Sequence, residues 1–344
     1  MSFRETKALV NLDNLVFNYR KYKEDTHLEV FAVVKANAYG HGDIEVAKKL
    51  ELEGVKVLCV SSLDEAIHLK EVGIKTDILI FSYVDPKYVE LHNTPQFIFT
   101  IPSRYWFDKV NEIDQELRLH LKINTGMNRV GVKHLEDALH IIKNTHHKIE
   151  GLYTHFSSSD EDNTVLDRQL KVFENFIERL DYPFKWIHAS NTHASNRAHS
   201  KHINAMRLGI GLYGYELNNH SLKQVLSLYT KVIHLETIQK GEAVGYNETY
   251  FATNEIKVAT VPIGYGDGLD MRHKFVIINH RKYPIIGKVC MDQMMIQVDD
   301  SVKMGDLVSI LSDEHTYKDI LKESSIMPYL VMTVLSSRVP REYI

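Results

Sequence analysis

The chain has 344 residues, 44% hydrophobic and 25% charged, a composition typical of a globular protein with one large domain or two smaller ones. Its formal net charge of −4 provides no basic field for nucleic acid, and no apolar run approaches the length needed to span a membrane. We therefore expect neither a nucleic-acid partner nor a membrane partner.

The cysteine and histidine residues indicate the cellular compartment of the protein and whether it binds a metal ion. Two cysteines, Cys59 and Cys290, are too few for a disulfide framework, and no apolar signal core follows the first residue. We therefore expect a cytoplasmic protein. The 19 histidines include no H-E-x-x-H spacing and the chain has no C-x-x-C, so we expect no metal site.

Short apolar runs alternate with helical patterns up to residue 208. A first helix is predicted from Asp13 to about Lys23. The predicted strands are 30–34, 57–60, 78–81, 97–100, 117–123, 149–154, 185–189 and 205–208, and the predicted helices between them include 44–52, 63–72, 104–113, 135–143 and 166–180. Eight strands alternating with helices favour an α/β fold of the closed (β/α)8 TIM type. A doubly wound open sheet is disfavoured because no G-x-G-x-x-G follows an early strand.

The pattern changes near residue 226. Shorter strand-like segments punctuated by glycines are predicted at 228–238, 256–263, 275–278, 283–289, 294–298 and 307–311, with a closing strand at 331–339. We predict a barrel domain over 10–225, followed by a mainly β domain over 226–344 that is joined by an N-terminal strand within 1–9.

One lysine sits at the end of the first predicted barrel strand. Phe31 to Val34 and Ala36 flank Lys35, and Gly40 and Gly42 stop the apolar run. Burial would lower the pKa of this amine and leave it nucleophilic, as imine chemistry requires. The alternative is a strand-end lysine whose ammonium reaches solvent.

Polar residues follow other predicted strands as well. They are Lys122 and Arg129 after strand five, His155 after strand six, His188, Asn191 and Thr192 after strand seven, and Arg207 to Gly211 after strand eight. Chemistry in a (β/α)8 barrel belongs at these carboxyl ends, and phosphate is usually held after strands seven and eight. Gly209 and Gly211 would let backbone N–H groups approach an anion, or they simply permit a tight turn.

Several segments resemble those of the alanine racemase family. Residues 33–42, V-V-K-A-N-A-Y-G-H-G, resemble its pyridoxal-phosphate attachment segment, and residues 122–131 resemble K-x-D/N-T-G-M-x-R-x-G. Further similar segments are T-H-F at 154–156, H-A-S-N-T at 188–192, R-L-G-I-G at 207–211, G-E-A-V-G-Y at 241–246, P-I-G-Y-G-D-G at 262–268, G-K-V-C-M-D at 287–292 and S-S-R-V-P-R at 336–341. Each alone is weak, whereas their order and spacing together are specific.

The resemblance implies a pyridoxal 5′-phosphate enzyme with two catalytic residues, Lys35 and Tyr246. It implies cofactor contacts from Lys35, Tyr39, His155, Asn191, Thr192, Arg207, Gly209 and Ile210, with Arg207 donating to the pyridine nitrogen. It further implies substrate contacts from Arg129 and Met291, and a carbamate on Lys122 as in some members. Two positions depart from the family pattern: Thr192 replaces a serine, and Ser337 replaces a tyrosine that reaches the phosphate. Serine is too short for that contact, which leaves the entrance width and the substrate range open.

The function implied is interconversion of L- and D-alanine by two bases, one on each face of the substrate. The residues leave open whether this reaction supplies cell-wall precursors or serves catabolism. The family also implies a head-to-tail homodimer in which Tyr246 and Met291 complete the partner's site. The alternatives are a racemase of serine or lysine, a non-catalytic pyridoxal-phosphate carrier, and a decarboxylase. The carrier needs no second domain, and the decarboxylase is disfavoured by Arg207.

Overall fold

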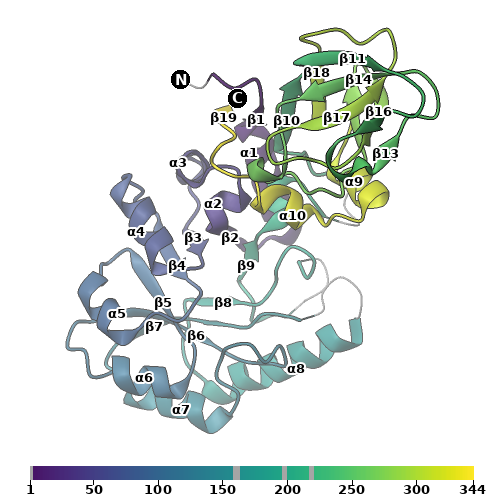
Figure 1. Ribbon diagram of the computed structural model, residues 1–344. Coiled ribbons are helices and arrows are strands. Elements are labelled where there is room, and N and C mark those ends of the chain that lie inside the picture. The colour runs from purple at the N-terminus through teal and green to yellow at the C-terminus, as the bar shows by residue number, and fades with distance from the viewer. Residues whose placement is uncertain (1–2, 158–162, 196–199, 217–220) are drawn as a thin grey trace. The chain divides into compact units, whose positions relative to one another are not determined.

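The computed structural model describes residues 3–157, 163–195, 200–216 and 221–344 (Figure 1). The chain forms two compact units. The barrel unit comprises residues 16–38 and 43–212, and the β unit comprises 1–15, 39–42 and 213–344. The short segment 39–42, which lies a few residues after Lys35, therefore belongs to the β unit.

Eight parallel strands close the barrel of the first unit. They are β2 (Glu29–Val33), β3 (Val57–Val60), β4 (Asp77–Ile80), β5 (Phe97–Ile101), β6 (Arg118–Lys122), β7 (Lys148–Tyr153), β8 (Trp186–His188) and β9 (Ala205–Leu208). Closure occurs where β9 pairs with β2, with Phe31 opposite Arg207. The predicted (β/α)8 barrel is confirmed. Each strand overlaps its predicted run because most residues of the barrel strands are buried and apolar, although β6 and β7 also contain charged residues such as Lys122 and Glu150.

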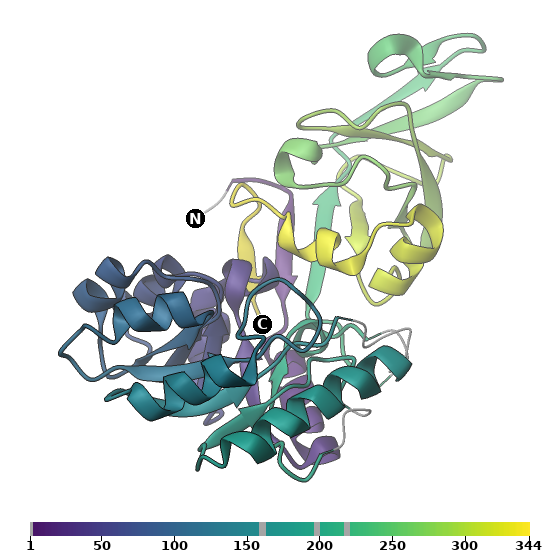
Figure 2. The same ribbon diagram turned by 90° about the horizontal axis from the view of Figure 1, so that it is seen from below.

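Helices lie on the outside of the barrel strands (Figure 2). They are α1 (Leu12–Thr26), α3 (Asp43–Leu52), α4 (Leu63–Glu71), α5 (Pro86–His92), α6 (Arg104–Val110), α7 (Leu135–Asn144) and α8 (Asn163–Leu180). The short helix α5 was not predicted, although Asp85 caps it by accepting the N–H of Lys87 and Pro86 occupies its first turn. In the described residues between β8 and β9 the chain forms turns only.

Gly151 shows how tightly the barrel interior is packed. A Cβ at this position would lie 2.7 Å from three atoms of the buried His120 ring. We therefore expect Gly151→Ala to lower the free energy of unfolding by about 1–3 kcal/mol, measured by urea denaturation, because the ring has no room to move. In a His120→Ala background this cost should shrink, and an equal cost in both backgrounds would contradict the explanation.

The β unit contains a nine-stranded sheet in the order β11-β14-β17-β16-β15-β18-β10-β1-β19. Its strands are β1 (Lys7–Val10), β10 (Leu226–Lys231), β11 (His234–Ile238), β14 (Ile256–Val261), β15 (Phe275–Ile278), β16 (Arg281–Ile286), β17 (Met294–Val298), β18 (Leu307–Leu311) and β19 (Arg341–Tyr343). The N-terminal strand β1 pairs antiparallel with β10 and parallel with β19, so the two ends of the chain lie in one sheet. The mainly β character predicted for this region is confirmed.

Two predictions for the β unit were wrong in detail. The segment 228–238 is two strands, β10 and β11, rather than one. The closing strand is β19, and most of 331–339 belongs to the helix α10 (Pro328–Thr333) and the turns that follow it. Pro328 in the first turn starts this helix, and the β-branched valines after it gave a misleading strand signal.

The helix α9 (Tyr317–Ser324) was not predicted, although Thr316 and Asp319 form a capping box at its start.

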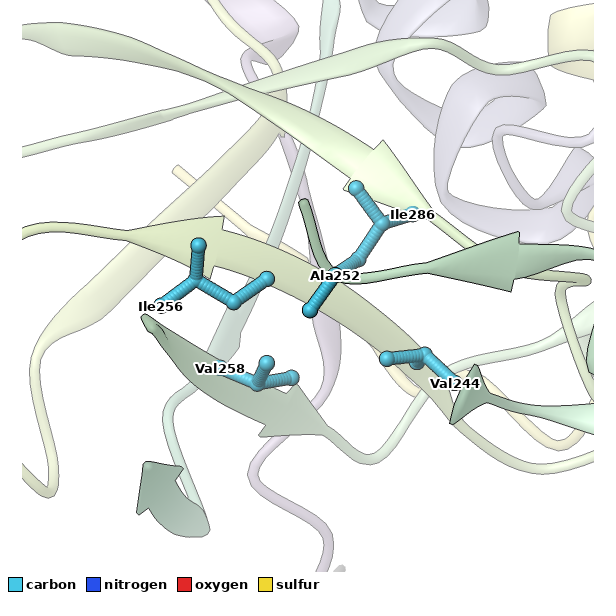
Figure 3. Close-up of a cluster of buried hydrophobic side chains, with 5 residues drawn as sticks. All are labelled: Val244, Ala252, Ile256, Val258 and Ile286. Atoms are coloured by element: carbon cyan, nitrogen blue, oxygen red, sulfur yellow. The ribbon is translucent and has the colours of Figure 1, made fainter. Parts of the chain in front are cut away.

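A separate small core supports a hairpin at one part of the β unit. Strands β12 (Ala243–Val244) and β13 (Tyr250–Phe251) pair antiparallel, and Tyr246 lies in the loop that connects them. The buried side chains of this core, shown in Figure 3, are Val244, Ala252, Ile256, Val258 and Ile286. This packing fixes the base of the hairpin and leaves its tip exposed.

Candidate active site

Lys35 lies two residues after the last residue of β2, at the carboxyl end of the barrel strands. Its side chain is half-buried, and burial together with the charge of Arg129 lowers the pKa of its amine. Glu65 acts in the opposite direction. A lowered pKa leaves more of the amine uncharged near neutrality, which agrees with the nucleophilic lysine predicted rather than with one that simply reaches solvent.

The chain after Lys35 forms a left-handed turn rather than an ordinary loop. Ala36, Asn37, Ala38 and Tyr39 have φ values of 54°, 54°, 50° and 52°. Left-handed backbone costs a non-glycine residue roughly 1–2 kcal/mol, so four in succession persist only where surrounding contacts hold them. Strain concentrated beside a half-buried lysine is characteristic of a functional site.

Arg207 is buried at the end of β9, with only 4% of its surface exposed. Its Nη1 donates to His188 Nδ1 at 2.8 Å and to the His188 carbonyl at 3.1 Å, and its Nη2 donates to the carbonyls of Thr154 at 2.7 Å and Ala189 at 2.9 Å. His155 Nδ1 lies 3.3 Å from Nη2. These contacts fix the orientation of the guanidinium through Nη1 and Nη2. Within the described chain none of them uses Nε, so the Nε–H remains available as a donor.

The two histidines beside Arg207 are neutral at pH 7. Burial, followed by the charge of Arg207, lowers the pKa of His155 to about 3 and that of His188 well below its ordinary value. Burial lowers the pKa of Arg207 only to about 10, so the guanidinium keeps its charge. Because arginine only donates, His188 Nδ1 must accept and its Nε2–H must donate to His120 Nδ1, 2.9 Å away.

The loops after β8 and β9 meet through a hydroxyl. Thr192 Oγ1 accepts the N–H of Gly211 at 3.1 Å, and Asn191 Oδ1 accepts the N–H of Ala194 at 3.0 Å. A Cβ on Gly211 would lie 2.7 Å from the Tyr22 hydroxyl and 2.8 Å from Thr192 Cγ2, so glycine is needed for this close approach. Gly209 and Ile210 precede Gly211 at the start of the 3₁₀ turn η1 (Ile210–Tyr213).

Lys122 and Arg129 place further positive charge at this end of the barrel. Lys122 is 6% exposed, and its Nζ lies 5.5 Å from the centroid of the Tyr153 ring. Burial and the charges of Arg129, Arg207 and Lys35 lower its pKa to about 7. Arg129 is exposed and lines a cavity of about 500 Å³ together with Asn124 and Asn128.

The remaining predicted site residues belong to the β unit. Tyr246 and Met291 are 68% and 51% exposed, and Tyr246 lies at the hairpin tip, where Asn247 and Glu248 adopt left-handed backbone. The Tyr39 ring packs 4.9 Å from the Tyr213 ring. The structure thus gathers nine predicted residues in the barrel unit, which are Lys35, Lys122, Arg129, His155, Asn191, Thr192, Arg207, Gly209 and Ile210.

Three residues that shape this site were not predicted from the sequence. His120 accepts from His188, Tyr153 stacks on His188 with ring centroids 4.7 Å apart, and Glu65 accepts the N–H of Ala36. Ser62 and Glu65 form a capping box that was visible in the sequence, but its contact with the Lys35 turn was not.

A closed barrel with a lysine and a buried arginine at its carboxyl end, followed by a mainly β domain, is the architecture of a two-domain barrel enzyme. The family model described as "Alanine racemase, N-terminal domain" matches residues 10–217, and "Alanine racemase, C-terminal domain" matches residues 225–343. The chain therefore belongs to the alanine racemase family.

Relatives match over nearly their whole length. An alanine racemase from Streptococcus uberis is 37% identical, with 99% of this chain and 98% of the relative covered. The crystal structure of alanine racemase from E. faecalis has a TM-score of 0.93 at 32% identity, covering 99% of this chain and 98% of the other. A histidine racemase from Leuconostoc mesenteroides subsp. sake has a TM-score of 0.89 at 27% identity, covering 100% and 99%. Within the described residues, no helix has the length and apolar character needed to cross a membrane.

Proposed function

We propose that this chain is a pyridoxal-phosphate-dependent racemase that interconverts L- and D-alanine. The observation that carries the proposal is the buried Arg207, which is charged at pH 7 and held by carbonyls and neutral histidines in a chain of this family. Pyridoxal phosphate and a homodimer are part of the same proposal. So is a barrel domain followed by a β domain that includes the N-terminal strand. These domains were predicted over 10–225 and 226–344, whereas the compact barrel unit begins at residue 16 and ends at residue 212.

The donor set of the barrel unit fits pyridoxal phosphate. Lys35 supplies an amine with a lowered pKa, and Arg207 Nε supplies a donor for the pyridine nitrogen. The Thr192 oxygen accepts from Gly211, which leaves its O–H to donate to a phosphate. When bound, the cofactor withdraws electrons from the substrate Cα and so makes the Cα hydrogen acidic.

Arg207 supports racemisation over competing reactions. A guanidinium donates but does not accept, and it stays charged with its pKa at about 10, so it disfavours a proton on the nitrogen it faces. The neutral His155 and His188 add no second charge there. A decarboxylase would place a carboxylate at this position, so the arginine argues against that alternative.

Racemisation needs a proton donor and acceptor on each face of the substrate Cα. We assign one face to Lys35 and the other to Tyr246 of the partner subunit. The 68% exposure of Tyr246 and the 51% exposure of Met291 within one chain support their use in a second copy's site. The guanidinium of Arg129 would bind the substrate carboxylate, with Met291 of the partner subunit as a further substrate contact.

Lys122 is proposed to carry a carbamate. Only an uncharged amine attacks carbon dioxide, and a pKa of about 7 makes this amine available near neutrality, whereas an ordinary lysine requires a pH above 10. We expect ¹³C-labelled bicarbonate to give a carbamate signal at pH 8 that disappears below about pH 6 and is missing in Lys122→Arg. A signal that persists in Lys122→Arg would assign the modification to another lysine.

Amino acids larger than alanine are alternative substrates of the proposed racemase. Ser337 is exposed where the family usually has a tyrosine, and one structural neighbour is named a histidine racemase. A shorter side chain at this position leaves room for a substrate larger than alanine. Serine, lysine and histidine are therefore the competitors of alanine in the test below.

The test measures optical rotation with the cofactor-loaded protein and each amino acid in turn. We expect the rotation of L-alanine and of D-alanine to decay to zero, with equal kcat/KM in the two directions because enantiomers have equal free energy. Higher kcat/KM for serine, lysine or histidine would move the assignment to that substrate. Binding of the cofactor without loss of rotation for any amino acid would favour the non-catalytic carrier.

A further inference from the structure

The left-handed turn after Lys35 is held at its first peptide by a carboxylate. Val34 N–H donates to the carbonyl of Cys59 in β3 at 2.9 Å. Two residues further on, the N–H of Ala36 donates to a side chain and not to β3, since its acceptor is Glu65 Oε1 at 2.7 Å. The turn then closes when Ala38 N–H donates to the Val34 carbonyl at 2.8 Å.

Glu65 lies in the first turn of α4, and its second oxygen ties it to the preceding loop. Oε2 accepts the N–H of Ser61 at 2.6 Å and the N–H of Ser62 at 3.2 Å. All three groups that the carboxylate contacts are backbone donors, so an ionised carboxylate, which only accepts, suits them all. One side chain therefore fixes the end of β2 against the start of α4, which follows the neighbouring strand.

The other end of the turn has its own support. Asn37 Oδ1 accepts the N–H of Asp43 at 3.0 Å, which closes the segment onto the start of α3. The contact between Asn37 and Asp43 lies at the far end of the turn, so it does not set the direction in which the chain leaves β2. That direction determines where the Cα–Cβ bond of Lys35 points, and it is fixed by the peptide between Lys35 and Ala36.

We infer that Glu65 is a positioning residue for Lys35. By accepting the Ala36 N–H it holds the left-handed turn in place and thereby aims the lysine side chain. The inference rests on the proposed function only in giving Lys35 a catalytic role, since the hold on the turn is a property of the chain itself. Substitution of Glu65 should therefore change both the backbone at Ala36 and the catalytic rate.

The competing explanation is that Glu65 serves only to cap α4. Ser62→Ala separates the two roles, because it removes the bond in which Ser62 Oγ accepts the Glu65 N–H at 3.3 Å and leaves the Ala36 contact intact. Glu65→Gln retains the size of the side chain but has one accepting oxygen. The two N–H groups of Ser61 and Ser62 favour that oxygen, so the donating amide nitrogen faces the Ala36 N–H. The two variants thus weaken the same cap, and only one disturbs the turn.

The experiment compares wild type, Glu65→Gln and Ser62→Ala by two measurements. The first is the amide proton shift and hydrogen exchange of Ala36 in the cofactor-free full chain. The second is kcat and KM for alanine in the loaded enzyme. We expect Glu65→Gln to move the Ala36 amide upfield, speed its exchange and lower kcat by up to about 10²-fold with little change in KM, as misplacement of a reacting group does.

Ser62→Ala should leave the Ala36 amide and kcat as in wild type. An unchanged Ala36 amide in Glu65→Gln, or an equal loss of kcat in Ser62→Ala, would overturn the inference. If wild type itself does not racemise alanine, the proposed function fails, while the amide measurement still tests the hold of Glu65 on the turn.

Discussion

Lys35→Ala should lower kcat for alanine racemisation by at least about 10⁴-fold, because in the proposed mechanism it removes both the amine that holds the cofactor and the base on one face. The half-buried position and lowered pKa of Lys35 are the features that make it suitable for both tasks. The measurement is loss of optical rotation under excess cofactor.

Two controls make the Lys35 result specific. Lys35→Arg retains a cation of similar reach but cannot form an imine, so it should be as inactive as Lys35→Ala. Lys48→Ala removes an exposed lysine of α3 and should retain wild-type activity. Retained racemisation in Lys35→Arg would mean that attachment through this side chain is not required.

Tyr246→Phe should lower kcat by about 10²–10⁴-fold, the range for loss of a general acid–base group. The ring is retained, so the hairpin formed by β12 and β13 should keep its packing. Because Lys35 still serves one face, the variant should exchange the Cα hydrogen of one alanine enantiomer with solvent deuterium without inverting it. Tyr105→Phe, which alters a 73% exposed tyrosine of α6, is the matched control.

Mixing the two inactive variants tests the shared site. If each site combines Lys35 of one subunit with Tyr246 of the other, a mixed dimer of Lys35→Ala and Tyr246→Phe contains one intact site of two. Refolding equal amounts together should then restore about a quarter of wild-type activity, since half of the dimers are mixed. No recovery would place both residues of each site in one chain.

The barrel could be predicted because its strands are buried on both faces and read as apolar runs. The strands β3, β9, β15, β17 and β18 were predicted with the bounds observed. Misreadings arose where local signals conflicted, as in α10, where β-branched residues follow a helix-starting proline. The closing strand β19 is only three residues long and charged, so its place beside β1 depends on a partner distant in sequence.

The site could be predicted to the extent that its residues follow strands. Lys35, Lys122 and Arg207 lie at strand ends, and the barrel fold brings strand ends together. Glu65 and His120 act through contacts with residues far along the chain, for which the sequence carries no local signal. The left-handed turn was not predicted because alanine and tyrosine do not mark such backbone, and a single asparagine does not indicate four consecutive left-handed residues.

The most direct test of the account is the origin of the Cα hydrogen in the product. Cofactor-loaded protein is given L-alanine in deuterium oxide, and the D-alanine formed in the earliest turnovers is analysed by mass spectrometry. Two bases on opposite faces predict that this D-alanine carries deuterium at Cα, because the group that delivers the new hydrogen has exchanged with the solvent and is not the group that removed the original one. D-alanine that retains its original hydrogen would mean that one group removes and returns it, and would contradict the two-base assignment.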